Sequence, residues 1–305
     1  MKRDPAELQR EILTLKEQTG ATILAHNYVD GAIQDIADFC GDSLELSVKA
    51  KKIQADLIIF CGVRFMAETA KILSPDSEVL LPAPDAGCPM ADMADPAEVA
   101  KYREEHPDAV FVAYVNTTAA VKALVDICCT SANADKVLRT IPADREVLFL
   151  PDQNLGANTA ARLGRKLQLW PGFCPTHNRI HPDDIRRIKA QYPNAKLLVH
   201  PECLPAVVEL ADAALSTGGM VKYVKESDAK EFIIGTENGI LHQLALQNPG
   251  KRLIPLEPLP TCPNMKKVTL ENLLHALEAH ETKVELPKEL MDCARLPIER
   301  MLAIG

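Results

Sequence analysis

The sequence lacks any apolar run long enough to cross a membrane. No stretch of about 18 consecutive apolar residues occurs in its 305 residues, which excludes a membrane-spanning helix. Residues 1–18, MKRDPAELQREILTLKEQ, are charged and lack the apolar core of a signal peptide. We therefore expect a cytoplasmic protein with no membrane partner.

Basic residues are too few and too scattered for a nucleic-acid-binding surface. Lys and Arg total 34 against 42 Asp and Glu, the net charge is −8, and no basic block occurs. Nucleic acid is therefore not an expected partner, because phosphate backbones are bound by clustered positive charge. An anionic substrate must be held by local groups, since the field of the whole molecule does not attract it.

Closely spaced cysteine pairs are also missing. The nine cysteines are an odd number and contain no C-x₂-C spacing. In a chain without an export signal this favours metal binding or buried thiols over a disulfide framework. What does recur is the pair Cys-Pro, at Cys88, Cys174 and Cys262, whereas random placement of nine cysteines and 22 prolines predicts fewer than one pair.

Apolar runs alternate with helix-period segments in a pattern that occurs three times. Each set has three predicted strands: 21–26, 55–61 and 77–82; 109–115, 145–151 and 165–170; and 195–200, 230–235 and 251–256. A predicted helix precedes each set, at 5–19, 96–105 and 182–191. The alternation predicts parallel sheets with helices on both faces.

Three kinds of residue recur at intervals of 86 or 88 positions, which indicates a true repeat. They are the strand-end residues His26, Tyr114 and His200, the hydroxyl residues Ser43, Ser131 and Thr217, and the cysteines of the Cys-Pro pairs. We therefore predict an α/β protein of three homologous parallel-sheet modules, arranged with pseudo-threefold symmetry around a central active site. The modules are residues 1–86, 87–172 and 173–267, with the tail, 268–305, packed on the first.

Equivalent strand ends predict one shared site, because ligands of parallel sheets bind beyond the carboxyl ends of the strands. Tyr28, Asn116 and Glu202 lie two residues past the strand ends and share a side of the extended chain with them. The recurring hydroxyls lie at predicted helix starts, where free N–H groups bind anions. Each hydroxyl is alternatively an ordinary helix cap, and His26, His177 and His200 are alternatively structural or surface histidines.

Three thiolates on one centre indicate a metal. Sulfur ligands favour Fe–S clusters, zinc or copper(I). A [4Fe–4S] cluster held by Cys88, Cys174 and Cys262 would leave one iron open as a Lewis acid. The following proline fixes the backbone and stiffens each loop. The other six cysteines are interpreted as buried small hydrophobic residues, with Cys203 ambiguous because it follows Glu202: Cys40, Cys61, Cys128, Cys129, Cys203 and Cys293.

The sequence resembles the quinolinate synthase family, the A protein of NAD biosynthesis, along nearly its whole length. The resemblance rests on nine segments in order: AHNYV (25–29), GDSLELS (41–47), AYVNTTA (113–119), CTSANA (129–134), LPDQNLG (150–156), VHPEC (199–203), STGGM (216–220), GTENG (235–239) and CPNMK (262–266). The family cysteines fall on the three that the repeat selects.

The resemblance implies three similar α/β domains around a central [4Fe–4S] cluster. It implies a transferase that forms a pyridine ring by condensing iminoaspartate with dihydroxyacetone phosphate, giving quinolinate, phosphate and two waters. It also implies functional coupling to aspartate oxidase, which would supply the unstable iminoaspartate.

Residue roles follow from the same resemblance and from the chemistry of each group. Glu202 is the expected general base, since a carboxylate in a closed cavity can have a pKa near the working pH. Tyr28 and Tyr114 would donate or relay protons, and Asn116 would orient a carbonyl. His26, Ser43 and Ser131 would contact phosphate or a carboxylate, and the residues expected to hold substrate carboxylates are His177, His200, Ser216 and Thr217.

Two other classes of function fit the same residues. A zinc-dependent lyase or hydrolase with a small anionic substrate would use the three cysteines and an open metal position. A non-catalytic protein that binds a phosphorylated metabolite would use the anion sites and keep the cysteines for structure.

Overall fold

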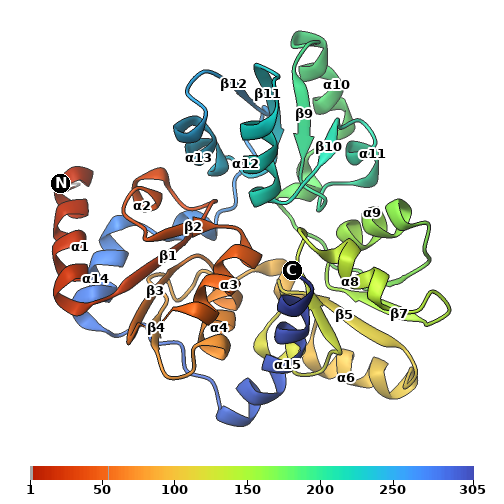
Figure 1. Cartoon of the computed structure of the whole chain (residues 1–305), viewed down its shortest axis with the longest axis horizontal. Coiled ribbons are helices and arrows are strands. Elements are labelled where there is room, and N and C mark those ends of the chain that lie inside the picture. The colour runs from red at the N-terminus through yellow and green to blue at the C-terminus, as the bar shows by residue number, and fades with distance from the viewer. Residues whose placement is uncertain (1–2, 54) are drawn as a thin grey trace.

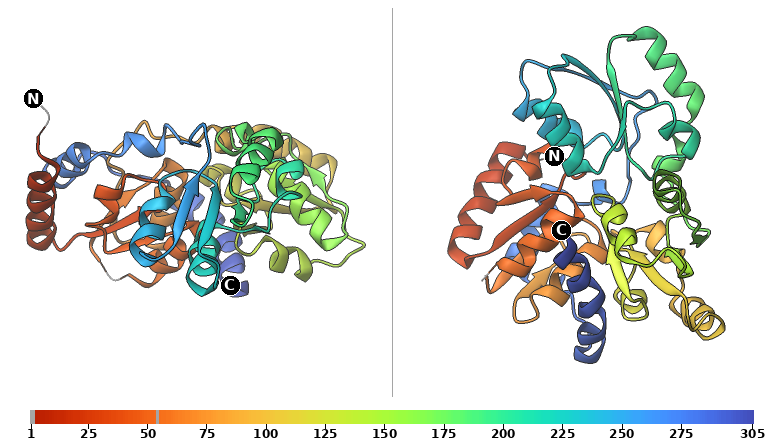
Figure 2. Two further views of the ribbon diagram at one scale, coloured as in Figure 1. Left: turned by 90° about the horizontal axis from the view of Figure 1, so that it is seen from above. Right: turned by 45° about the vertical axis from the view of Figure 1, so that its right-hand side comes forward.

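The computed structural model describes residues 3–53 and 55–305, and these residues form three four-stranded parallel sheets. Figure 1 shows the sheets in three lobes around a common centre, and Figure 2 shows that the lobes lie side by side in a flattened molecule. The predicted fold class, α/β with repeated parallel sheets, is confirmed.

The first unit carries the sheet of order β2-β1-β3-β4. Its elements are α1 (Pro5–Thr19), β1 (Thr22–His26), α2 (Gly31–Gln34), β2 (Phe39–Gly41), α3 (Ser43–Lys52), β3 (Leu57–Cys61), α4 (Arg64–Leu73) and β4 (Glu78–Leu80). Helix α1 begins where the Asp4 carboxylate accepts the N–H of Ala6, and it ends at Gly20, whose φ of 67° only glycine adopts readily.

The second unit repeats that order as β6-β5-β7-β8. Its elements are α5 (Pro89–Asp92), α6 (Pro96–Glu105), β5 (Val110–Tyr114), α7 (Ala119–Lys122), β6 (Ile127–Cys129), α8 (Ala134–Thr140), β7 (Val147–Leu150), α9 (Gln153–Leu163) and β8 (Gln168–Leu169). The predicted start of α6 is confirmed, because Asp95 caps the helix and Pro96 occupies its first turn.

The third unit repeats it again as β10-β9-β11-β12. Its elements are the 3₁₀ helix η1 (His177–Arg179), α10 (Pro182–Gln191), β9 (Lys196–Val199), α11 (Pro205–Val208), β10 (Ala213–Ala214), α12 (Thr217–Glu226), β11 (Glu231–Gly235), α13 (Ile240–Gln247) and β12 (Arg252–Pro255). The tail follows with η2 (Met265–Lys267), α14 (Leu270–Ala279) and α15 (Lys288–Ile304).

Strand pairing confirms that the three sheets are related by the spacing in the sequence. Leu24 pairs with Phe39 in the first sheet, Val112 with Ile127 in the second, and Leu198 with Ala213 in the third. Each partner lies 88 and then 86 residues after its predecessor, as the cysteines and strand ends predict. One β-α fold has therefore been used three times with the same register.

The nine predicted strands are present, but three short ones were missed. These are β2, β6 and β10, which have two or three residues each and form one edge of their sheets. Such a strand contains no apolar run long enough to be recognised, and only its pairing with the neighbouring strand makes it a strand.

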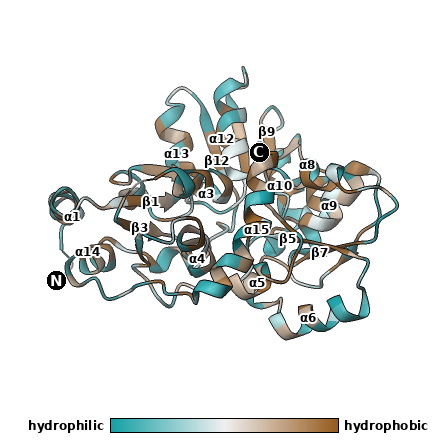
Figure 3. Ribbon diagram, turned by 60° about the horizontal axis from the view of Figure 1, so that its bottom comes forward, coloured by the Kyte–Doolittle hydropathy of each residue, from teal (hydrophilic) through white to brown (hydrophobic). Residues whose placement is uncertain are grey.

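Burial follows the pattern that parallel sheets require. All five residues of β3 are buried, and so are four of five in β1 and in β5, because helices cover both faces of each sheet. Figure 3 shows the apolar strands in brown and the mainly hydrophilic outer helix α6. None of the described helices combines the length and the apolar character needed to cross a bilayer.

The tail contacts two units. Helix α14 lies against α1 and β3 of the first unit, while α15 lies against α7 and β6 of the second and also against α4 of the first. The tail therefore packs on the first unit and additionally joins it to the second. The exact division of the chain after residues 86, 172 and 267 stays a prediction.

Candidate active site

One cavity of about 370 Å³ is lined by residues from all three units. Of the sequence-predicted site residues, the following line it: His26, Tyr28, Ser43, Cys88, Tyr114, Asn116, Ser131, Cys174, His177, His200, Glu202, Thr217 and Cys262. The structure thus brings together thirteen side chains that the sequence spreads over more than 230 positions. Asp42, Arg179 and Glu237 also line the cavity and were not predicted.

Ser216 is the predicted site residue that does not line the cavity. Its hydroxyl caps α12 by accepting the N–H of Gly219 at 3.1 Å. The next residue, Thr217, begins the helix and lines the cavity. The structure therefore gives Ser216 the capping contact and leaves Thr217 as the residue that lines the cavity.

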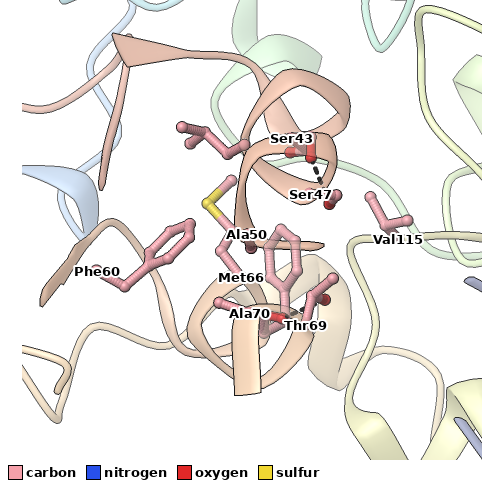
Figure 4. Close-up of a pocket in the computed structure, with 10 residues that line it drawn as sticks. Ser43, Ser47, Ala50, Phe60, Met66, Thr69, Ala70 and Val115 are labelled. Atoms are coloured by element: carbon pink, nitrogen blue, oxygen red, sulfur yellow. Dashed lines mark hydrogen bonds between the residues drawn. The ribbon is translucent and has the colours of Figure 1, made fainter. Parts of the chain in front are cut away.

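The helix start at Ser43 lies beside a carboxylate. Asp42 accepts the N–H groups of Leu44 and Glu45, both at 3.0 Å, so two donors of this helix terminus are already used. Figure 4 shows the largely apolar wall behind Ser43, where Ser47 donates to its carbonyl oxygen at 2.6 Å. At Ser43 an anion would therefore meet chiefly the hydroxyl, since the Asp42 carboxylate opposes negative charge there.

Two histidines at equivalent strand ends have the same local geometry. The backbone N–H of Tyr28 donates to His26 Nδ1 and that of Glu202 donates to His200 Nδ1, each at 3.2 Å. Burial lowers the pKa of both histidines to about 3. Both rings are therefore neutral at physiological pH, and each keeps its proton on Nε2, where it can donate to a ligand.

A continuous chain of short contacts crosses the centre of the site. Tyr28 Oη lies 2.6 Å from Thr236 Oγ1, which lies 2.8 Å from His177 Nε2. His177 Nδ1 lies 2.7 Å from Glu202 Oε2, and Tyr114 Oη donates to Glu202 Oε1 at 2.6 Å. All five side chains are buried, and together they come from all three units. Thr236 is thus a member of the site that sequence reasoning missed.

The environment of Glu202 corrects one premise of the sequence interpretation. Burial raises the pKa of this carboxyl, but nearby His200 and His177 and the hydrogen bonds from His177 and Tyr114 outweigh burial. The pKa of Glu202 therefore lies well below its ordinary value, not near the working pH. The group is an ionised carboxylate that holds two donors, and burial raises the pKa of both Tyr28 and Tyr114 well above 10, which keeps them protonated.

Three thiols face the same cavity. Burial raises the pKa of Cys88 to about 12 and also raises the pKa values of Cys174 and Cys262. Three half-buried thiols around one cavity are the kind of set that a metal centre deprotonates on binding. Of the other cysteines, Cys61, Cys128, Cys129 and Cys203 are buried as predicted, but Cys293 is exposed on α15, so its interpretation as a buried residue was wrong.

Two buried carboxylates hold the loops of two cysteines. Asp152 Oδ2 accepts the backbone N–H of Cys174, and Glu237 Oε1 accepts that of Cys262, each at 3.2 Å. Both carboxylates lie two residues past equivalent strands, where the first unit has Val63. Asp152 and Glu237 lie within the segments LPDQNLG (150–156) and GTENG (235–239), yet the sequence did not reveal their contacts with the cysteine loops.

The turns that carry the strand-end pairs are held by buried donors. Gln34 Nε2 donates to the carbonyl oxygens of residues 27 and 29, on either side of Tyr28, at 3.1 and 2.8 Å. At the equivalent position of the second unit, Lys122 Nζ donates to Thr117 beside Asn116. The third unit has Val208 there, and Asn158 of the second unit supplies the donor instead, bonding the carbonyl oxygens of residues 201 and 203 at 2.9 Å.

Replacing Asn158 with leucine should therefore destabilise the protein and loosen the turn that carries Glu202. We expect the free energy of unfolding to fall by about 1–3 kcal/mol, because two buried carbonyl groups lose their donor. Urea unfolding of both proteins measures the change. The control is Ala161→Gln at an exposed position of the same helix. Equal unfolding midpoints for the wild type and Asn158→Leu would show that the two Asn158 hydrogen bonds do not stabilise the protein.

Comparison with known proteins gives a consistent result. A family profile described as Quinolinate synthetase A protein matches residues 10–303. A quinolinate synthase of Methanoregula boonei is 52% identical over 301 residues, which is 99% of this chain and 99% of that protein. Similar proteins are the quinolinate synthases of Dehalococcoides mccartyi strain BAV1, 52% identical over 97% of this chain and 98% of that protein, and of Geobacter metallireducens, 50% identical over 97% of each.

Proposed function

The chain belongs to the quinolinate synthetase A protein family, and from that premise we propose that it condenses iminoaspartate with dihydroxyacetone phosphate. The products are quinolinate, phosphate and two waters, and the reaction forms a pyridine ring for NAD biosynthesis. The observation that carries the proposal is one cavity in which three repeat-related thiols face a carboxylate, two neutral histidines and two protonated tyrosines.

The residues present fit an iron–sulfur cofactor. Cys88, Cys174 and Cys262 line one cavity, and no other described cysteine does. They would hold a [4Fe–4S] cluster with one iron free of protein ligands, and when bound this group supplies Lewis-acid polarisation of a substrate oxygen. The arrangement of three lobes around this point supports a pseudo-threefold axis through it.

Substrate anions would be held by neutral donors. His26 and His200 present Nε2–H groups, and Ser43, Ser131 and Thr217 present hydroxyls beside the cavity. Both ring nitrogens of His177 already have partners within the protein. We therefore assign His177 to holding Glu202 in place, rather than to binding a substrate carboxylate as the sequence suggested. Arg179 is the only Lys or Arg among the described lining residues, and it would attract the anionic substrates.

Proton transfer would centre on Glu202. The carboxylate is ionised and free to take a proton from a substrate C–H or N–H while Tyr114 and His177 keep it oriented, and its lowered pKa makes it a weaker base than an ordinary glutamate. Asn116 Oδ1 is buried at the cavity wall with no partner among the described residues. An unpaired amide oxygen favours a substrate hydroxyl or N–H at that point, rather than the carbonyl expected from sequence.

The enzyme assay tests this proposal directly. Protein purified without oxygen is expected to be brown, to contain about four irons per chain, and to form quinolinate from iminoaspartate and dihydroxyacetone phosphate. The control omits one substrate at a time. A fully iron-loaded protein that makes no quinolinate would refute the function, and a colourless, zinc-loaded protein that is active would refute the cluster.

A further inference from the structure

A second donor set lies beside the three-cysteine set and shares only one residue with it. One potential ligand atom from each of Cys174, His177 and Glu202 lies within 4.8 Å of the other two, and Cys174 is half-buried while the other two residues are buried. His177 Nδ1 is 3.2 Å from the sulfur and 2.7 Å from the carboxylate oxygen. One thiolate, one imidazole and one carboxylate are ligands that Zn²⁺ accepts together.

We propose that the cluster-free protein binds one Zn²⁺ ion through Cys174, His177 and Glu202, at a site different from the Cys88–Cys174–Cys262 set. The charges balance, because a thiolate and a carboxylate together neutralise the ion while the imidazole stays neutral. Because Cys174 belongs to both sets, zinc and the proposed cluster would compete for it, and only this competition rests on the proposed function. The zinc site itself follows from the three donor atoms.

The distances require little movement. Tetrahedral zinc with ordinary bond lengths places sulfur and nitrogen ligands about 3.5 Å apart, and nitrogen and oxygen ligands about 3.4 Å apart. The sulfur–nitrogen distance of 3.2 Å is close to this value. The Glu202 oxygen, at 2.7 Å from the imidazole, must withdraw by roughly 0.7 Å, a shift within the reach of a side-chain torsion.

The groups behind the donors already support metal binding. A zinc-bound histidine usually donates its other ring N–H to an oxygen, and His177 Nε2 lies 2.8 Å from Thr236 Oγ1. The second oxygen of Glu202 accepts from Tyr114 at 2.6 Å, which fixes the carboxylate. All three donors line the cavity, so the fourth position faces open space and would hold water, as in zinc sites with three protein ligands.

Cobalt(II) titration of the full-length cluster-free chain tests the site. Co²⁺ reports tetrahedral thiolate coordination through its visible absorption, and Zn²⁺ should displace it. We expect one ion per chain in the wild type and unchanged binding in Cys88→Ser and Cys262→Ser. Cys174→Ser and His177→Ala should each weaken binding by more than tenfold, with the far-UV circular dichroism spectrum used to confirm folding.

Thr236 provides a near-isosteric pair of variants. Thr236→Val removes the oxygen that orients His177 and should weaken Co²⁺ binding about 10–100-fold, whereas Thr236→Ser should bind as the wild type does. Loss of binding in Cys88→Ser and Cys262→Ser, with retention in His177→Ala, would overturn the proposal in favour of a three-thiolate site. Absence of a stoichiometric site in the wild type would also overturn it.

The two proposals fail separately. If cluster-loaded wild type makes quinolinate but the cluster-free chain binds no Co²⁺, only the zinc site is refuted. If Co²⁺ binds as expected but loaded protein makes no quinolinate, the zinc site stands and the proposed function falls.

Discussion

Cys88→Ser is expected to abolish both cluster assembly and quinolinate formation. The side chain lines the central cavity, and a serine hydroxyl at that position offers a harder, far less acidic ligand than a thiol. Iron and sulfide content per chain, visible absorption and quinolinate production after anaerobic reconstitution measure the effect. A complete cluster contributes about four irons per chain. We expect the variant to contain fewer irons than that and to form no detectable quinolinate.

Two other cysteines serve as controls for that variant. Cys293 is exposed on α15, and Cys61 is buried in β3 away from the cavity lining. Cys293→Ser should match the wild type in iron content and turnover, and Cys61→Ser should keep its iron although it buries a hydroxyl. A Cys88→Ser protein that assembles a full cluster and turns over normally would show that Cys88 is not a ligand.

The parts of the fold that repeat could be predicted from the sequence. Spacings of 88 and 86 residues at the strand ends and at the cysteines reappear in the strand register. The edge strands could not be predicted in the same way. Residues 213 and 214 form β10 only because β9 offers a parallel partner, and two alanines carry no strand signal of their own.

The site residues divide along the same line. Those at equivalent positions with similar chemistry, such as His26 and His200, were found because the repeat singles them out. Thr236 was missed because the equivalent positions are Gly62 and Pro151, which share no chemistry with it. Asn158 was missed for a different reason, since it acts across a unit boundary on a turn whose own unit lacks a donor.

Local charge could not be read from the sequence either. A carboxylate predicted to lie in a closed cavity suggests a raised pKa, because burial disfavours the charged form. The structure places His200 and His177 beside Glu202 and adds hydrogen bonds from His177 and Tyr114, and these contacts together lower the pKa of Glu202 despite its burial. Whether burial or the neighbouring groups have the larger effect on the pKa of Glu202 depends on how the fold places residues from different units.

Glu202→Gln should cause the largest loss of turnover that leaves the three cysteines untouched. We expect kcat to fall about 10²–10⁴-fold, the range for removal of a general base, with iron content unchanged. A neutral amide cannot take up the proton, and its single oxygen cannot serve both Tyr114 and His177 as the carboxylate does. Anaerobic steady-state kinetics on iron-matched samples measure the change.

The Glu202→Asp variant completes the test. It keeps the charge but shortens the side chain by one methylene, so it should retain more activity than Glu202→Gln if proton transfer is the function of this residue. If the carboxylate served only to hold Tyr114 and His177, both variants should lose activity to a similar extent, because glutamine offers a single acceptor oxygen and aspartate places its two oxygens one methylene short of these donors. A glutamine variant with kcat within tenfold of the wild type would show that Glu202 is not the general base and would place the base elsewhere in the cavity.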